Sequence, residues 1–170
     1  MIMINNLIHT SIISLLSSMV VVLLQGCTTT QQNQGTSTFR DQLVLKSLEG
    51  EIMDHKLIEN KVLILNLWAT WCKPCIEEMP DLEKMQGQLS PDFILLLASD
   101  QNRKKIRKFT KNKGFDLQFV QIENSMESLG VYALPTTLII GRDGSLKETL
   151  VGMRKWNQAD QLKSFNQYLK

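Results

Sequence analysis

The segment that most restricts the fold is NLWATWCKPCIEEMP, residues 66–80, in which Lys-Pro separates two cysteines. It continues a nearly unbroken apolar run that begins at residue 61 and is typical of a strand buried on both faces. Pro74, just after Cys72, fits the first turn of a helix, where its missing N–H would have no partner anyway. The chain is therefore predicted to pass from a buried strand into a helix at the cysteine pair.

The rest of the folded part alternates between strand-like and helix-like patterns. Strand patterns cover residues 42–48, 51–58, 93–99, 117–122, 136–140 and 146–152, and helix patterns cover about 73–89, 104–113, 125–130 and 157–168. This order predicts an α/β domain over residues 39–170, with a mixed central β-sheet, helices on both faces and an added N-terminal hairpin. The turn at residues 142–145 is expected to join the last two strands as a second hairpin.

The charge balance argues against a nucleic-acid-binding protein. The formal net charge is only +2, with 21% charged and 43% apolar residues, as in a globular domain. One basic run, residues 103–113, has its apolar residues Ile106 and Phe109 three positions apart, which suits a helix with one buried stripe. A patch that binds anions or membranes is the alternative, but no aromatic interleaving supports it.

The N-terminus differs in kind from the rest of the chain. Residues 1–26 contain no Lys, Arg, Asp or Glu, and Ile12 to Leu24 are apolar except for serines. A short apolar region followed by small residues is the form of a secretory signal. The stretch LLQGC resembles a bacterial lipoprotein signal, which implies cleavage before Cys27 and a lipid on that cysteine. The alternative is an uncleaved membrane anchor over residues 7–24.

The polar residues 27–38 are expected to form a flexible tether between the signal and the domain. Either reading of the N-terminus predicts a membrane-anchored domain that faces the periplasm or the cell exterior. Disulfides persist in such compartments.

The cysteine pair could be a redox couple, half of a metal site or two buried thiols. A tetrahedral metal site lacks ligands, because His55 is the only other residue of the usual kind, so no metal is expected. At a helix N-terminus, unpaired N–H groups, the macrodipole and Lys73 would stabilise a Cys72 thiolate. Cys75, one turn later, would lie within disulfide reach and face inward. We expect Cys72 to be the exposed nucleophile and Cys75 the buried resolving thiol.

NLWATWCKPCIEEMP and the later LGVYALPTTLIIGRDGSL resemble the thioredoxin superfamily. Glu78 and Pro80 match the Glu-x-Pro of the membrane-tethered periplasmic thiol-disulfide oxidoreductases, which are related to the cytochrome c maturation reductases, so the chain resembles this branch in particular. The resemblance implies that Trp71 shields Cys72 and that Pro135 is a cis-proline facing the cysteines, where substrate backbone pairs. Glu78, unlike its exposed neighbour Glu77, would relay a proton to the resolving thiol.

Thioredoxin itself has a buried acid on the strand before the cysteines, whereas this chain has Asn66 at that position. Proton transfer would therefore fall to Glu78 or to water. Trp68, on the same strand, is expected in the core.

The resemblance implies an enzyme without a cofactor that reduces disulfides of exported proteins, apocytochrome c among the candidates. In an oxidising compartment such a reductant needs a transmembrane electron donor. An oxidant or isomerase on the same fold is one alternative. A non-enzymatic tethered module that holds a client or a metal through the same thiols is another.

Overall fold

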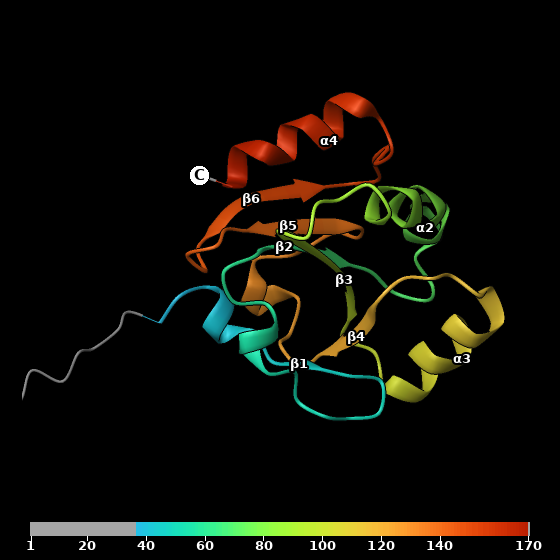
Figure 1. Cartoon of the computed structure of the whole chain (residues 1–170). Coiled ribbons are helices and arrows are strands. Elements are labelled where there is room, and N and C mark those ends of the chain that lie inside the picture. The colour runs from blue at the N-terminus through green and yellow to red at the C-terminus, as the bar shows by residue number, and fades with distance from the viewer. Residues whose placement is uncertain (1–36, 170) are drawn as a thin grey trace, which may run out of the picture. The chain divides into compact units, whose positions relative to one another are not determined.

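Residues 37–169, the part of the chain that the structure describes, form a six-stranded sheet in this computed structural model (Figure 1). The strand order is β1–β4–β3–β2–β5–β6. Strand β2 pairs in parallel with β3 and antiparallel with β5, so the predicted mixed sheet is confirmed. The strands are β1 (Leu45–Lys46), β2 (Val62–Leu67), β3 (Phe93–Ser99), β4 (Phe119–Ile122), β5 (Thr136–Ile140) and β6 (Leu146–Val151).

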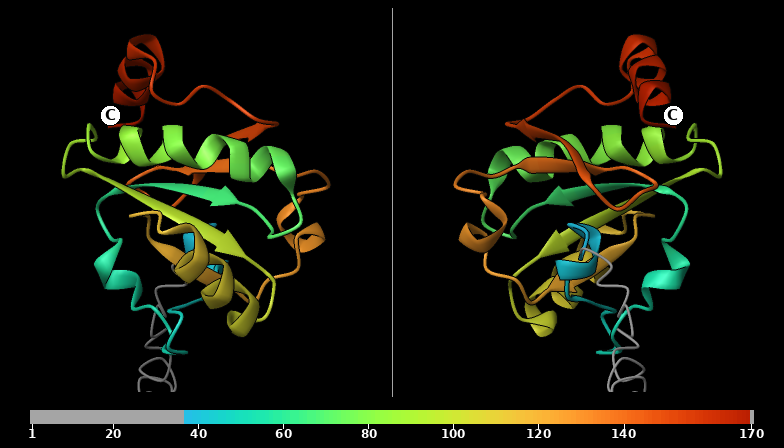
Figure 2. Two further views of the ribbon diagram at one scale, coloured as in Figure 1. Left: turned by 90° about the vertical axis from the view of Figure 1, so that its right-hand side faces the viewer. Right: turned by 90° about the vertical axis from the view of Figure 1, so that its left-hand side faces the viewer.

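The α-helices within residues 37–169 pack against one core on one face of the sheet (Figure 2). They are α2 (Lys73–Gln86), α3 (Arg103–Lys113) and α4 (Ala159–Phe165), the last continued by the 3-10 helix η4 (Asn166–Leu169). Leu82, Ile106 and Phe165 represent the three helices in this core, which also holds Val62 and Ile64 of β2.

The opposite face of the sheet is covered by short 3-10 helices. They are η1 (Arg40–Gln42), η2 (His55–Leu57) and η3 (Glu127–Leu129). Helices were expected on both faces of the sheet, and the structure adds that those on this face are 3-10 helices. The topology explains why the α-helices share the other face. The parallel crossovers β2–α2–β3 and β3–α3–β4 advance in one direction along the sheet, and both are expected to be right-handed. Both helices therefore lie on the same face.

The strands of the N-terminal hairpin are much shorter than the alternating sequence pattern predicted. Its first strand is the two-residue β1, which pairs with β4, and its return consists of a single antiparallel bridge between Lys46 and Ile52. The return strand stops because Asp54 accepts a hydrogen bond from the Lys56 N–H and starts η2. A side chain that bonds its own backbone thus ends the extended run.

A buried arginine connects the start of the domain to the sheet. The guanidinium of Arg40 donates hydrogen bonds to the backbone oxygens of Lys61, before β2, and Gly141, after β5, at 2.7 and 2.5 Å. The Arg40 N–H also donates to the Gly144 carbonyl at 2.9 Å. Helix η1 is therefore attached to two separate parts of the fold.

The predictions for the signal at residues 1–26, for Cys27 and for most of the 27–38 tether lie outside the described residues. Within residues 37–169, no helix is both long and apolar enough to cross a membrane.

Candidate active site

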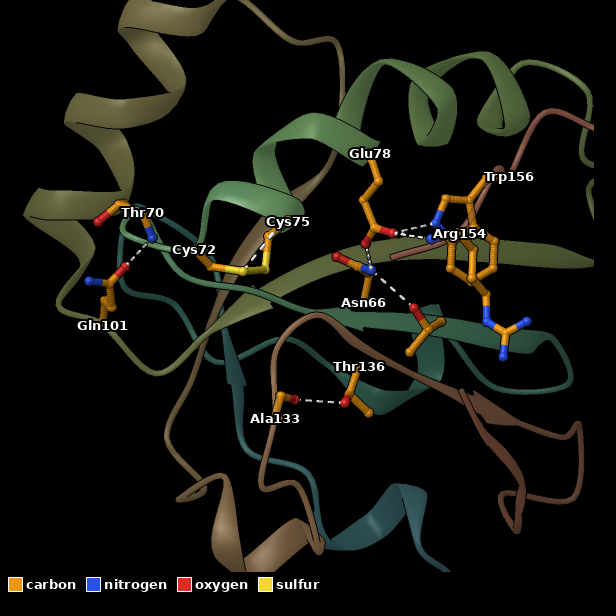
Figure 3. Close-up of a disulfide and its surroundings, with 11 residues drawn as sticks. Asn66, Thr70, Cys72, Cys75, Glu78, Gln101, Ala133, Thr136, Arg154 and Trp156 are labelled. Carbon is orange, nitrogen blue, oxygen red and sulfur yellow. Dashed lines mark hydrogen bonds between the residues drawn. A yellow bond between two sulfur atoms is a disulfide. The ribbon is translucent and has the colours of Figure 1, made fainter. Parts of the chain in front are cut away.

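Cys72 and Cys75 form a disulfide at the start of α2, and the S–S distance is 1.99 Å (Figure 3). Cys72 is the N-cap residue of the helix, and its Sγ accepts a hydrogen bond from the Cys75 N–H at 3.3 Å. Pro74 occupies the first turn, as predicted. The arrangement places one sulfur where free helical N–H groups stabilise negative charge.

The two sulfurs do not differ in exposure as much as expected. Cys75 is fully buried, and Cys72 is only 4% exposed in this disulfide form, so the prediction of an exposed Cys72 is wrong here. The physical reason is the bond itself, which holds the Cys72 sulfur against an interior partner. Cys72 is still the more accessible of the two.

The residues expected to support Cys72 are more exposed than it is. Lys73 lies in solvent and forms a 3.7 Å ion pair with Glu77, so that carboxylate partly offsets its charge. Trp71, the residue expected to shield Cys72, is 73% exposed, while Cys72 itself is only 4% exposed. Trp68, in contrast, is fully buried in the core, as predicted.

The Leu134–Pro135 peptide bond is cis, as the resemblance implied. Pro135 directly precedes β5, and Thr136 of β5 pairs with Leu67, the last residue of β2. Because β2 leads into the cysteine loop, this register brings the cis bond to the carboxyl end of β2, where that loop begins.

Glu78 is buried, at 2% exposure, and its carboxylate accepts three hydrogen bonds (Figure 3). Asn66 Nδ2 donates to Oε1 at 2.8 Å, while the Arg154 backbone N–H and Trp156 Nε1 donate to Oε2 at 3.1 and 2.9 Å. Burial raises the pKa of the Glu78 carboxyl, and the three donors oppose that rise only in part. The Glu78 carboxyl therefore takes up a proton more readily than an exposed glutamate does.

The same network shows what Asn66 does. From the sequence it was known only as a difference from thioredoxin. Its amide Nδ2 also donates to Thr137 Oγ1 at 3.0 Å, and its buried Oδ1 has no partner among the described residues. The carboxyl that thioredoxin carries on this strand is here supplied from α2.

Trp156 and Arg154 are members of this network that the sequence reasoning missed. They lie more than 70 residues after Glu78, in the loop that follows β6. The only available signal was an isolated tryptophan in a polar stretch, which by itself does not indicate a partner.

No group of three or more His, Cys, Asp or Glu side chains gathers to hold a metal within residues 37–169. His55 instead lies with Nε2 at 3.1 Å from the Leu43 carbonyl oxygen.

Comparison with known proteins identifies relatives of this site and fold. Residues 40–149 match the model of the AhpC/TSA family. A thiol-disulfide oxidoreductase ResA from Bacillus cereus is 31% identical over 121 residues, which cover 69% of this chain and 70% of the relative. The thioredoxin-like protein YneN of Bacillus subtilis is 30% identical over 124 residues, covering 69% of this chain and 72% of YneN.

Solved structures share the fold at lower identity. A thiol:disulfide interchange protein DsbE of Chlorobium tepidum, so described provisionally, superposes with a TM-score of 0.64 at 21% identity, covering 75% of this chain and 92% of that one. StoA of Bacillus subtilis superposes with a TM-score of 0.58 at 23% identity, covering 72% and 94%. The chain therefore belongs to the AhpC/TSA family and, within the thioredoxin fold, to the ResA-like thiol-disulfide oxidoreductases.

Proposed function

We propose that this chain reduces disulfides of exported proteins through Cys72 and Cys75, while anchored to a membrane and facing the periplasm or the cell exterior. The observation that carries the proposal is the cysteine pair at the N-terminus of α2, with Cys72 as its N-cap. Helix N–H groups lower the pKa of a thiol in that position, and the thiolate is the attacking species.

The reaction starts from the dithiol form. The Cys72 thiolate attacks one sulfur of the substrate disulfide, which forms a mixed disulfide and releases the first substrate thiol. The Cys75 thiolate then attacks the Cys72 sulfur, and the second substrate thiol leaves. Two electrons pass to the substrate, and the enzyme is left with the Cys72–Cys75 disulfide seen in the structure.

Glu78 is proposed to buffer the proton of the resolving step. Cys75 must lose its proton before it attacks, and Glu78 is a buried carboxyl one helical turn away whose pKa is raised by burial. The carboxylate reaches from α2 to Asn66 on β2 (Figure 3), and a water molecule would carry the proton between the Cys75 thiol and this carboxylate.

Pro135 is proposed to border the substrate-binding surface beside the cysteines. Its place at the start of β5, next to the end of β2, supports this role. An extended substrate segment could pair with the backbone of Leu134, the residue before the cis bond, while its disulfide faces Cys72.

The reaction is proposed to take place at a membrane surface. Cys27 would carry the lipid that anchors the chain, and a transmembrane dithiol donor would return the enzyme to its reduced form. Apocytochrome c, whose cysteines must be reduced before haem attachment, is one client class that fits the resemblance.

The test is insulin reduction by the domain from residue 37 to 170 with dithiothreitol, combined with a redox titration in glutathione buffers. Turnover that disappears in Cys72→Ser supports an enzyme, and its absence in the parent domain would indicate a binding module. A potential above about −180 mV, the isomerase range, would contradict the direction and point to an oxidant or isomerase.

A further inference from the structure

Two exposed aromatic side chains line one pocket beside the active site. Within residues 37–169, Trp71 and Tyr132 are the exposed large aromatic residues, at 73% and 84% exposure. Both line a cavity of about 290 Å³ together with Ala133, Leu134 and others. Aromatic side chains are usually buried for their large apolar area, so two exposed rings in one pocket indicate a binding surface.

The same pocket carries two carboxylates that are free to meet a ligand. Asp100, just after β3, and Glu127, in η3, both line it and are exposed. Among the ion pairs and hydrogen bonds of residues 37–169, neither carboxylate has a partner, and no Lys or Arg lines the cavity. Lys73, the cation next to Cys72 in sequence, is already paired with Glu77.

The pocket adjoins the disulfide by chain connectivity on both sides. Trp71 immediately precedes Cys72, and Ala133 and Leu134 immediately precede the cis-Pro135. A substrate segment whose disulfide faces Cys72 would therefore place a neighbouring side chain in this cavity.

We propose that this pocket binds a cationic side chain, lysine or arginine, located next to the cysteine of the disulfide substrate. The inference rests on the proposed reductase function and specifies its substrate class. A cation is attracted both by the faces of tryptophan and tyrosine and by carboxylates. The volume lies at the lower end of the range for sites that enclose a whole small-molecule ligand, so it suits one side chain.

The experiment compares peptides that share one intramolecular disulfide and differ at a single position next to a cysteine, which is lysine, norleucine or glutamate. Reduction is followed in a single turnover of the prereduced protein, and the second-order rate constant is measured for each peptide. One cation–π contact and two partly screened ion pairs predict a preference for lysine over norleucine of about tenfold. Glutamate should react more slowly than norleucine, and the lysine preference should shrink at high salt.

The variant Asp100→Asn/Glu127→Gln should reduce the lysine-to-norleucine ratio to between about two and five, because only the aromatic attraction remains. Tyr132→Leu, which changes no charge, should reduce the ratio in part. The matched control is Glu51→Gln/Asp116→Asn, which removes the same charge from exposed positions outside this pocket and should leave the ratio unchanged.

The outcomes separate the two proposals. Equal rates for the lysine and norleucine peptides, with reduction of both, overturn the cation pocket and leave the reductase function standing. A ratio that falls as much in the control as in Asp100→Asn/Glu127→Gln assigns the preference to overall charge and also overturns the pocket. No reduction of any peptide overturns the reductase function and the pocket with it.

Discussion

The amide of Asn66 on β2 donates a 2.8 Å hydrogen bond to the carboxylate of Glu78 on α2, and both side chains are buried. The pair joins the central strand to the helix that carries the cysteines. In this hydrogen-bond network the carboxyl comes from helix α2 and the amide comes from strand β2.

Exchanging the two groups tests that relationship. Asn66→Asp alone places two carboxyls in contact in the interior, where both cannot ionise together, and should cost about 2–4 kcal/mol of the free energy of unfolding. Asn66→Asp/Glu78→Gln restores one carboxyl and one amide, so it should be more stable than Asn66→Asp by at least about 1 kcal/mol. Urea unfolding at neutral pH measures the free energies of these two variants and of Glu78→Gln alone. Additive costs would mean that the two side chains do not interact.

The buried carboxyl of Glu78 predicts a pH dependence of stability. Its pKa in the folded state lies above the usual 4.5, so the folded protein binds more protons than the unfolded chain between these two pKa values. Stability from this group is therefore complete below about pH 4.5 and falls as the pH rises, by at most about 1.4 kcal/mol per pH unit.

The comparison with Glu78→Gln isolates this contribution. The stability of the parent minus that of Glu78→Gln should decrease from about pH 4.5 upward and level off above the raised pKa. Urea titrations of the two proteins across this range measure the difference. Parallel curves would show that burial does not raise the pKa.

Two buried tryptophans, one with and one without a hydrogen bond from its indole N–H, allow the contribution of the bond to Glu78 to be measured. Trp156 Nε1 donates to Glu78 Oε2, whereas the buried Nε1 of Trp68 has no partner among the described residues. Trp156→Phe should therefore cost about 1–3 kcal/mol more than Trp68→Phe, because only the first removes a hydrogen bond to the buried Glu78 carboxyl. Thermal or urea unfolding at pH 7 compares them. Equal losses would mean that the indole contributes only its volume.

The unequal roles of the cysteines predict opposite trapping results. Cys75→Ser leaves the nucleophile without its resolving partner, so mixed disulfides with substrate should accumulate and disappear on reduction. Cys72→Ser should trap little, because Cys75 is fully buried. Non-reducing gels of the two variants after incubation with an oxidised substrate show the difference. Stronger trapping by Cys72→Ser would reverse the assignment.

Local patterns predicted most of the fold. The start of α2 was predicted at Lys73 and observed there, and α3 begins at Arg103, one residue before its prediction. Buried strands were found because apolar runs without interruption have few other solutions. Helix ends were less accurate, since α2 was expected to continue to residue 89 but ends at Gln86, followed by Gly87.

Site residues were predicted correctly only where they lie close to one another in the sequence. The cysteines and Pro74 are close in sequence, so spacing alone describes them. The partners of Glu78 come from β2 and from the loop after β6, and only the sheet order brings them together. The low exposure of Cys72 could not be predicted from the sequence either, because it depends on how the disulfide packs in the folded protein.

Arg40 has a mechanical consequence. A chain pulled at Ser37 would load η1 first, and η1 is held by the Arg40 contacts to the oxygens of Lys61, Gly141 and Gly144. Because Arg40 comes before β1 in the chain, the pull would reach these contacts, with the residue before β2 and with the β5–β6 turn, before it reaches β1. The two-residue strand β1 would therefore be protected from peeling away one bond at a time.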